Sequence, residues 1–209
     1  MEEFDIAIIG GGPAGIMAAI AASADLNIVL LEKNSSLGSK LLITGGGRCN
    51  ITNEKPIKKL LNSFHDKNFL KHSFYTFTNE MLLDLFRNRG LDFIVEDNNR
   101  VFPETEKSQD ILAILKYYLK DITIKYNYEV SDIKKEDNFI INNDIIAEKV
   151  IIATGGATFP KTGSTGDGYY LTDNPVTDIK YGLVPLITKK DLSDIAGITL
   201  YDVVIKYKT

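Results

Sequence analysis

The 209-residue sequence has one cysteine, only two histidines and no long uninterrupted apolar run. The single cysteine, Cys49, excludes an internal disulfide framework and any metal site that needs several thiolates. His65 and His72 lie in a polar stretch and are interpreted as surface residues, so we predict no metal site. No segment reaches the roughly 18 consecutive apolar residues of a membrane span. We therefore expect no membrane partner.

The sequence also lacks an excess of basic charge. Its 24 lysines and arginines are outnumbered by 28 acidic residues, which gives a formal net charge of -4. The basic residues are dispersed, and this distribution predicts no nucleic-acid partner. The acidic start Met1-Glu2-Glu3 lacks the basic region of a signal peptide, so the cytoplasm is the expected location.

The first informative stretch is a strand–glycine loop–helix pattern at residues 4–24. Residues 4–9 are predicted to form a buried strand and residues 14–24 a helix of small residues. Between them, "GGGPAG" at residues 10–15 fits the dinucleotide-binding motif G-x-G-x-x-G. Its glycines permit a tight turn, close approach to a pyrophosphate and close helix–strand packing. The helix N-terminus then favours a bound phosphate.

A second predicted strand, residues 27–31, ends in Glu32, 22 residues after Gly10. A carboxylate at this place is expected to accept hydrogen bonds from an adenosine ribose, and it disfavours a 2'-phosphate. The pattern therefore predicts a dinucleotide site, with NAD and FAD both possible at this point.

A second glycine-rich stretch, "GSKLLITGGGRCNITN", spans residues 38–53. Consecutive glycines let backbone N–H groups face a planar or anionic ligand, while Lys40 and Arg48 offer positive charge. The alternative is a flexible surface loop with a solvated arginine. The combination of Thr44, three glycines, Arg48, Asn50 and a further Thr-Asn pair in one stretch favours ligand binding.

Two further glycine-containing turns follow in the second half of the chain. Residues 148–153 are predicted to form an apolar strand that ends at Thr154-Gly155-Gly156, where ligands of open α/β sheets gather. A simple turn is the alternative. Asp167, within "GSTGDGYY", either accepts hydrogen bonds from sugar or ribityl hydroxyls or caps its own turn.

The intervening sequence predicts ordinary structural elements. A helix capped by Thr78 is expected to end before Gly90, and a second helix is expected from Ser108 to about Asp121. Short apolar runs in residues 122–146 predict strands of a small antiparallel sheet.

These motifs, together with "RVFPETEKSQDI" and "LVPL", resemble the BaiN-like, aminoacetone oxidase-like family of NAD(P)/FAD-dependent flavoproteins. The resemblance implies an extended FAD, with its ADP half on the first glycine loop and its isoalloxazine ring near residues 44–53. It also implies that Val130 and the strand end at residues 154–156 approach the cofactor. The residues so predicted to contact the cofactor are Gly10, Gly12, Pro13, Ala14, Gly15, Glu32, Lys33, Lys40, Leu41, Thr44, Gly45, Gly46, Gly47, Arg48, Asn50, Val130, Thr154, Gly155, Gly156 and Asp167.

The predicted fold is α/β, a Rossmann-like FAD-binding domain of the glutathione-reductase type with a small antiparallel sheet. Residues 1–190 are assigned to this domain and residues 191–209 to the first strand of an inserted substrate domain. The resemblance further implies that the C-terminal part of the family architecture is missing from this chain.

The predicted function is hydride transfer from NAD(P)H through FAD to a small organic acceptor or to oxygen. A dithiol relay is excluded because Cys49 is alone, and no catalytic residue or oligomeric state is assigned. Two alternatives remain open. One is a catalytically inert fragment that binds FAD or ADP, and the other is a flavoprotein acting on tRNA.

Overall fold

The computed structural model describes residues 1–22, 25–172 and 174–180. The chain divides into two compact units, Met1–Asn174 and Pro175–Thr209, and every helix and strand described below lies in the first. The predicted domain boundary at residue 190 and the predicted strand at 191–209 lie outside the described residues.

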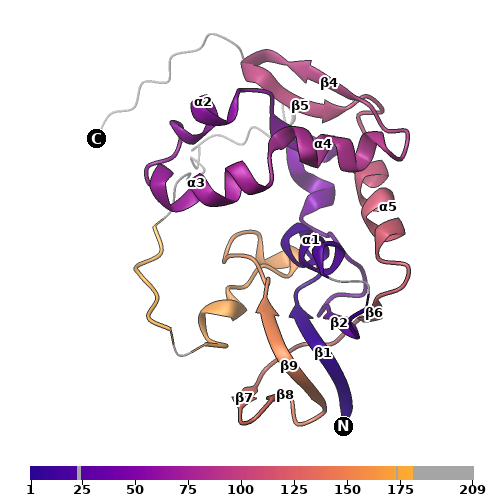
Figure 1. Cartoon of the computed structure of the whole chain (residues 1–209), viewed down its shortest axis with the longest axis vertical. Helices are drawn as coiled ribbons and strands as arrows, with labels where there is room; N and C mark the ends of the chain where they lie inside the picture. Colours follow the sequence, from indigo (N-terminus) through magenta and orange to yellow (C-terminus); the bar gives the residue numbers. More distant parts are fainter. Residues whose placement is uncertain (23–24, 173, 181–209) are drawn as a thin grey trace, which may run out of the picture. The chain divides into compact units, whose positions relative to one another are not determined.

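The first unit contains a six-stranded sheet, whose strands lie in the lower half of the view in Figure 1. Its order is β6-β2-β1-β9-β8-β7, in which β6, β2, β1 and β9 are parallel, β8 pairs antiparallel with β9, and β7 pairs antiparallel with β8. The strands are β1 (Glu2–Ile9), β2 (Ile28–Leu31), β6 (Thr123–Lys125), β7 (Ile133–Lys135), β8 (Phe139–Ile141) and β9 (Ile145–Ile152).

Alternating side chains of the central strands form two separate cores, one on each face of the sheet. Ile8 and Leu30 belong to a cluster with α1 (Pro13–Ala21) and α5 (Ser108–Tyr118). Ile9 and Leu31, one residue further along each strand, belong to the opposite cluster. Because both faces are buried there, β2 and the C-terminal half of β1 are apolar, as expected for parallel sheets, whereas the more exposed start of β1 carries Glu2, Glu3 and Asp5.

A second, three-stranded antiparallel sheet follows the glycine-rich stretch at residues 38–53. Its order is β3-β5-β4, from strands β3 (Thr52–Asn53), β4 (Phe93–Glu96) and β5 (Arg100–Pro103). Three helices lie between β3 and β4 in the sequence, namely α2 (Ile57–Leu61), α3 (Lys67–Thr76) and α4 (Asn79–Arg87).

The Rossmann-type fold and the strand–helix–strand unit at the N-terminus are confirmed. The N-cap of α4 is also as predicted, since the Thr78 hydroxyl accepts a hydrogen bond from the Met81 N–H at 3.2 Å. The predicted small antiparallel sheet is present, and β3, β5 and β4 form it. Residues 122–146 contain strands as predicted, but their assignment to the small sheet was wrong. β6 pairs in parallel with β2, and β7–β8 extends the main sheet.

Candidate functional site

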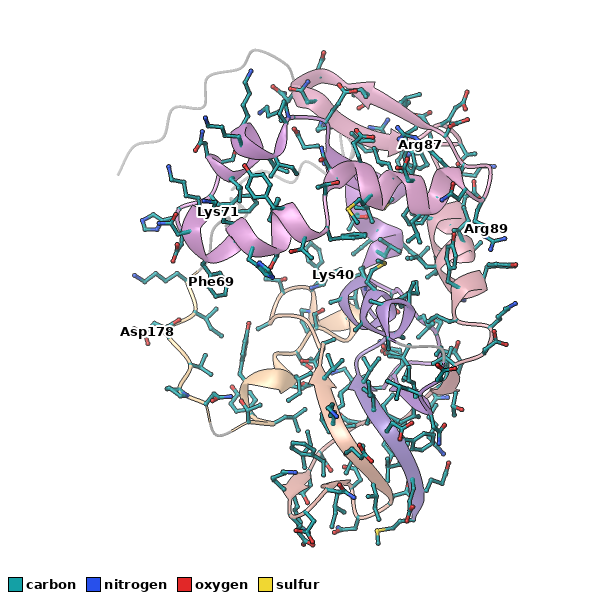
Figure 2. The ribbon with its side chains drawn as sticks, in the orientation of Figure 1. Lys40, Phe69, Lys71, Arg87, Arg89 and Asp178 are labelled. Atoms are coloured by element: carbon teal, nitrogen blue, oxygen red, sulfur yellow. The ribbon has the colours of Figure 1, made fainter. Side chains whose placement is uncertain are left out.

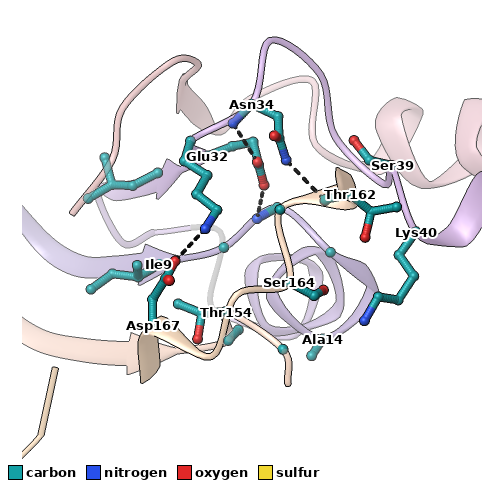
Figure 3. Close-up of a pocket in the computed structure, with 18 of the residues that line it drawn as sticks. Ile9, Ala14, Glu32, Asn34, Ser39, Lys40, Thr154, Thr162, Ser164 and Asp167 are labelled. Carbon is teal, nitrogen blue, oxygen red and sulfur yellow. Dashed lines mark hydrogen bonds and ion pairs between the residues drawn. The ribbon is translucent and has the colours of Figure 1, made fainter. Parts of the chain in front are cut away.

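A pocket lies at the carboxyl ends of β1, β2 and β9 (Figure 3). Ile9, Leu31 and Ala153 line its floor, and the strand order changes direction here because β2 and β9 lie on opposite sides of β1. Open α/β sheets bind ligands at this kind of switch point. The fold therefore places the candidate site where the sequence predicts it.

The first glycine loop forms one wall of the pocket and leads directly into α1. Gly12 is the N-cap of α1, and no side chain caps the helix there. A carbon atom added at Gly12 would meet no heavy atom within 4 Å, so the protein leaves this space open. An uncapped helix N-terminus beside open space is suited to an anionic ligand.

Glu32, at the end of β2, is buried and holds the loop in place. Its Oε2 accepts a hydrogen bond from the Gly11 N–H, and its Oε1 accepts one from the Asn34 N–H, each at 2.7 Å. Both bonds are charge-assisted and fix the carboxylate at the pocket wall. Glu32 thus connects the two predicted halves of the nucleotide motif.

Lys33 and Asp167 form an ion pair that joins the end of β2 to the segment after β9. The Lys33 ammonium lies 2.6 Å from Asp167 Oδ2 and also donates to the Thr165 hydroxyl. Burial alone would raise the pKa of Asp167, but the hydrogen bonds from Lys33 and Thr165 and the Lys33 charge lower it below its ordinary value. A parallel link runs from the Asn34 side chain to the Thr162 carbonyl, 3.3 Å away.

Lys40 differs from Lys33 because no carboxylate within the described residues pairs with its ammonium group. Lys40 lines the pocket, and its hydrogen bond goes to the neutral Thr158 hydroxyl at 3.3 Å. Figure 3 shows its side chain alongside Ala14, in the first turn of α1. Its charge is therefore available to an anion in the pocket.

The structure brings together only part of the predicted cofactor-contact set. The residues that line the pocket are Gly10, Gly12, Pro13, Ala14, Glu32, Lys33, Lys40, Val130, Thr154, Gly155 and Asp167. The residues that do not are Gly15, Leu41, Thr44, Gly45, Gly46, Gly47, Arg48, Asn50 and Gly156. Gly15 packs under the loop, and Leu41 is buried in the core.

The second glycine loop stands apart from this pocket. Residues 41–47 form a short 3-10 segment that continues from Lys40 and is interrupted by a kink at residues 44–46, where Gly45 and Gly46 are exposed. The Thr44 hydroxyl donates to the Leu41 carbonyl at 2.7 Å. Contact between this loop and a ring therefore stays a prediction.

Arg48 has a role that the motif did not reveal. Its guanidinium lies 2.7 Å from carboxylate oxygens of both Glu96 and Glu106, and 4.1 Å from the centroid of the Phe102 ring. Hydrogen bonding to Arg48 lowers the pKa of Glu96 below its ordinary value. In the structure, Arg48 ties the glycine loop to the three-stranded sheet.

Sequence reasoning missed several pocket residues: Asn34, Gly38, Ser39, Tyr128, Thr162, Gly163, Ser164 and Leu171. Ser39 adjoins Lys40, and residues 162–164 belong to the same glycine-rich run as Asp167, so proximity in sequence was an available signal. No signal in the sequence pointed to Tyr128. Burial is the main reason that the pKa of its phenol is raised to about 12, and a hydrogen bond to Asp144 raises it further.

The part of the chain that the structure describes contains neither a metal-binding cluster nor a membrane-spanning helix. No three histidine, cysteine, aspartate or glutamate side chains gather there into a possible metal site. No helix in the same residues has both the length and the apolar character needed to cross a bilayer.

The sheet, the glycine loop and the pocket define a Rossmann-type nucleotide-binding protein. Comparison with a solved flavocytochrome c3 fumarate reductase gives a TM-score of 0.61 at 19% identity, covering 81% of this chain and 40% of that one, which supports the fold. A family described as "HI0933-like protein Rossmann domain" matches residues 4–181. The chain belongs to this HI0933-like family.

Two curated relatives show what kinds of enzyme resemble this chain. The 3-dehydro-bile acid delta(4,6)-reductase of Clostridium scindens is 32% identical, over 88% of this chain and 48% of the relative. The ribosomal RNA dihydrouridine synthase of Escherichia coli K12 is 29% identical, over 98% of this chain and 54% of the relative. The chain thus spans about half the length of these relatives. Because the second relative is named as an enzyme of ribosomal RNA, the prediction of no nucleic-acid partner is not supported.

Proposed function

We propose that the pocket at the ends of β1, β2 and β9 holds the ADP half of FAD and that the chain is the nucleotide-binding part of a flavin-dependent oxidoreductase. The single observation that carries this proposal is the open space at Gly12, directly in front of the uncapped N-terminus of α1. A glycine loop with no protein atom above it fits a closely approaching diphosphate.

The residues around this space have chemically distinct tasks in the proposal. The N-terminus of α1 and the Lys40 ammonium hold the diphosphate, because both present unneutralised positive charge to the pocket. Glu32, fixed by Gly11 and Asn34, presents its remaining acceptor capacity to the adenosine ribose. The Lys33–Asp167 pair keeps the segment after β9 against the pocket.

When bound, FAD supplies hydride transfer between a reduced nicotinamide and an acceptor. We propose NAD(P)H as donor and a small organic molecule or oxygen as acceptor. The bile-acid reductase relative supports a small organic acceptor. The exposed backbone of Gly45 and Gly46, which follows Lys40 in the chain, is available to meet the ring end of the cofactor.

A second candidate function is reduction of a base in RNA. It is favoured by the ribosomal RNA dihydrouridine synthase relatives, of which the Escherichia coli protein aligns with nearly the whole chain. Both candidates use the same cofactor site and differ only in the acceptor.

Cofactor binding and electron transfer are tested separately on the purified 209-residue chain. Titration with FAD and with ADP, followed by calorimetry and flavin fluorescence, should give saturable binding of both. The absorbance of bound FAD near 450 nm should then fall on anaerobic addition of NADH or NADPH.

Each outcome points to a definite conclusion. Binding with bleaching supports the oxidoreductase proposal for this chain. Binding of FAD and ADP without bleaching favours the inert nucleotide-binding alternative. Failure of both ligands to bind would refute the assignment of the pocket.

A further inference from the structure

Among the described residues, three polar or charged residues are buried, namely Glu32, Ser108 and Ser164. Glu32 accepts two hydrogen bonds from backbone N–H groups, and the Ser108 hydroxyl donates to the Leu42 carbonyl at 2.9 Å. Ser164 is only 7% exposed, yet neither its hydroxyl nor its backbone N–H forms a hydrogen bond with another residue of the described chain. A buried polar group without a partner is costly unless water or a ligand satisfies it.

The Ser164 hydroxyl faces the pocket at the ends of β1, β2 and β9, which Ser164 lines. In the residues that the structure describes, every fully enclosed side-chain oxygen or nitrogen has a hydrogen-bond partner. Because the Ser164 Oγ has no partner, it is not enclosed by protein and is accessible from the pocket. Figure 3 shows the Ser164 side chain pointing toward the side of the pocket where Ala14 and Lys40 lie.

The hydroxyl also lies close to the first glycine loop. A carbon atom added at Gly155 would come within 3.4 Å of the Ser164 Oγ, so the hydroxyl sits beside the end of β9. A carbon atom added at Gly10 would come within 2.9 Å of the Thr154 Cα, so the end of β9 in turn packs against the glycine loop. The hydroxyl therefore belongs to the part of the pocket that surrounds the N-terminus of α1.

Hydrogen bonds on both sides of Ser164 fix its position. The Asn34 amide donates to the carbonyl of Thr162, two residues before Ser164, at 3.3 Å. The Lys33 ammonium donates to the hydroxyl of Thr165, the next residue, at 2.6 Å. Because the backbone is tied on either side, the hydroxyl is held in place before any ligand binds, which lowers the entropy that a ligand contact costs.

We propose that the Ser164 hydroxyl donates a hydrogen bond to the diphosphate of the bound nucleotide and thereby makes the pocket favour nucleotides over nucleosides. The inference rests on the proposed function, in which the pocket holds the ADP half of FAD. It adds to that site a specificity-determining residue from the segment after β9, on the wall opposite the glycine loop and Lys40.

The chemistry of the surrounding groups favours a phosphate oxygen over a sugar hydroxyl as the partner of Ser164. A phosphate accepts hydrogen bonds and does not donate them, so it needs several donors. The N-terminus of α1, the Lys40 ammonium and the unpaired groups of Ser164 are all donors. Ribose hydroxyls can donate, and the acceptor suited to them in this pocket is the Glu32 carboxylate.

The test is calorimetric titration of the purified 209-residue chain with ADP, and with adenosine by competition against ADP up to millimolar concentration. Ser164→Ala should weaken ADP binding by about tenfold to a hundredfold, because a hydrogen bond to a charged group is lost. Adenosine lacks the diphosphate, so its affinity should be the same in the variant and in the wild type.

Thermal unfolding without ligand separates this role from a structural one. Ser164→Ala removes a hydroxyl that no protein group pairs with, so the variant should keep or raise the wild-type Tm. Ser108→Ala is the matched control, because it also truncates a buried serine but removes a hydrogen bond inside the protein. Ser108→Ala should lower Tm and leave the affinity for ADP unchanged.

Three results would overturn the inference and leave the proposed function standing. If Ser164→Ala bound ADP as tightly as the wild type, water alone would satisfy the hydroxyl. If ADP and adenosine lost affinity equally, Ser164 would contact the nucleoside. If Ser164→Ala lowered Tm as much as Ser108→Ala, the role of Ser164 would be structural. Failure of the wild-type chain to bind either ligand would instead refute the assignment of the pocket and this inference with it.

Discussion

Replacing Gly12 with alanine separates the needs of the fold from those of a ligand. The backbone at Gly12 has φ -79° and ψ 179°, a conformation that alanine adopts without strain. The added methyl group meets no protein atom within 4 Å. In the proposed complex, however, this methyl group occupies the space through which the diphosphate approaches the loop.

Two small and opposing effects on stability are expected. Alanine reduces the conformational entropy of the unfolded chain, which stabilises the protein by about 0.4–1 kcal/mol. Alanine is also a poorer N-cap than glycine, which destabilises by up to about 1 kcal/mol. The free energy of unfolding should therefore change by less than about 1 kcal/mol, or about 2–4 °C in Tm.

The effect on ligand affinity should be larger. Forcing a methyl group into a filled site costs about 1–3 kcal/mol, which corresponds to about fivefold to 150-fold weaker binding of FAD and ADP. Gly15→Ala is the contrasting variant, because its methyl group would overlap the Gly10 carbonyl oxygen inside the protein itself. Gly15→Ala should lose about 1–3 kcal/mol of folding stability even without ligand.

Calorimetric titration and thermal unfolding of both variants provide the measurement. We expect Gly12→Ala to lose affinity while its Tm stays within about 4 °C of the wild-type value, and Gly15→Ala to have a lower Tm. If Gly12→Ala bound FAD and ADP as tightly as the wild type, the space in front of α1 would not be the diphosphate site. The proposed function would then lose its main support.

Three further predictions address single residues. Thr78→Ala removes the N-cap bond from the Met81 N–H and should cost about 1 kcal/mol in urea unfolding; an unchanged midpoint would contradict the role of this cap. The folded-state pKa of Asp167 lies below its unfolded value near 3.8, so its contribution to stability is present above that value and is lost as the pH falls through the folded-state pKa. Asp167→Asn should therefore flatten the fall in Tm below about pH 5, and a parallel pH profile would argue against the pairing with Lys33. Burial raises the pKa of the Cys49 thiol, so Ellman's reagent at pH 8 should react slowly with the native chain and rapidly with one thiol in guanidinium; equal rates would show that Cys49 is accessible.

The N-terminal nucleotide-binding unit was predictable because its signals are local. A short apolar run typical of a buried strand, a glycine loop and an acid at the end of β2 all lie within residues 2–32, and each constrains the same strand–helix–strand unit. Hydrophobic periodicity likewise predicted α4 and α5, because both bury one face in the core.

The helix α3 and the pairing of β6, which sequence reasoning missed, lack such signals. α3 buries no residue, so its pattern contains no core-facing stripe to detect. β6 has only three residues, and its parallel pairing with β2 depends on contacts about 94 positions apart in the sequence. The sequence shows the composition of such a short strand, but it does not show which strand it pairs with.

The sequence also does not show which cations of the site are paired with carboxylates. The motifs identify three cations near a ligand, namely Lys33, Lys40 and Arg48. This prediction uses residue type alone. The fold then pairs Lys33 with Asp167 and Arg48 with Glu96, through contacts 134 and 48 residues apart. Lys40 is left facing the pocket with a neutral partner, and so attraction of a diphosphate depends on Lys40 together with the N-terminus of α1.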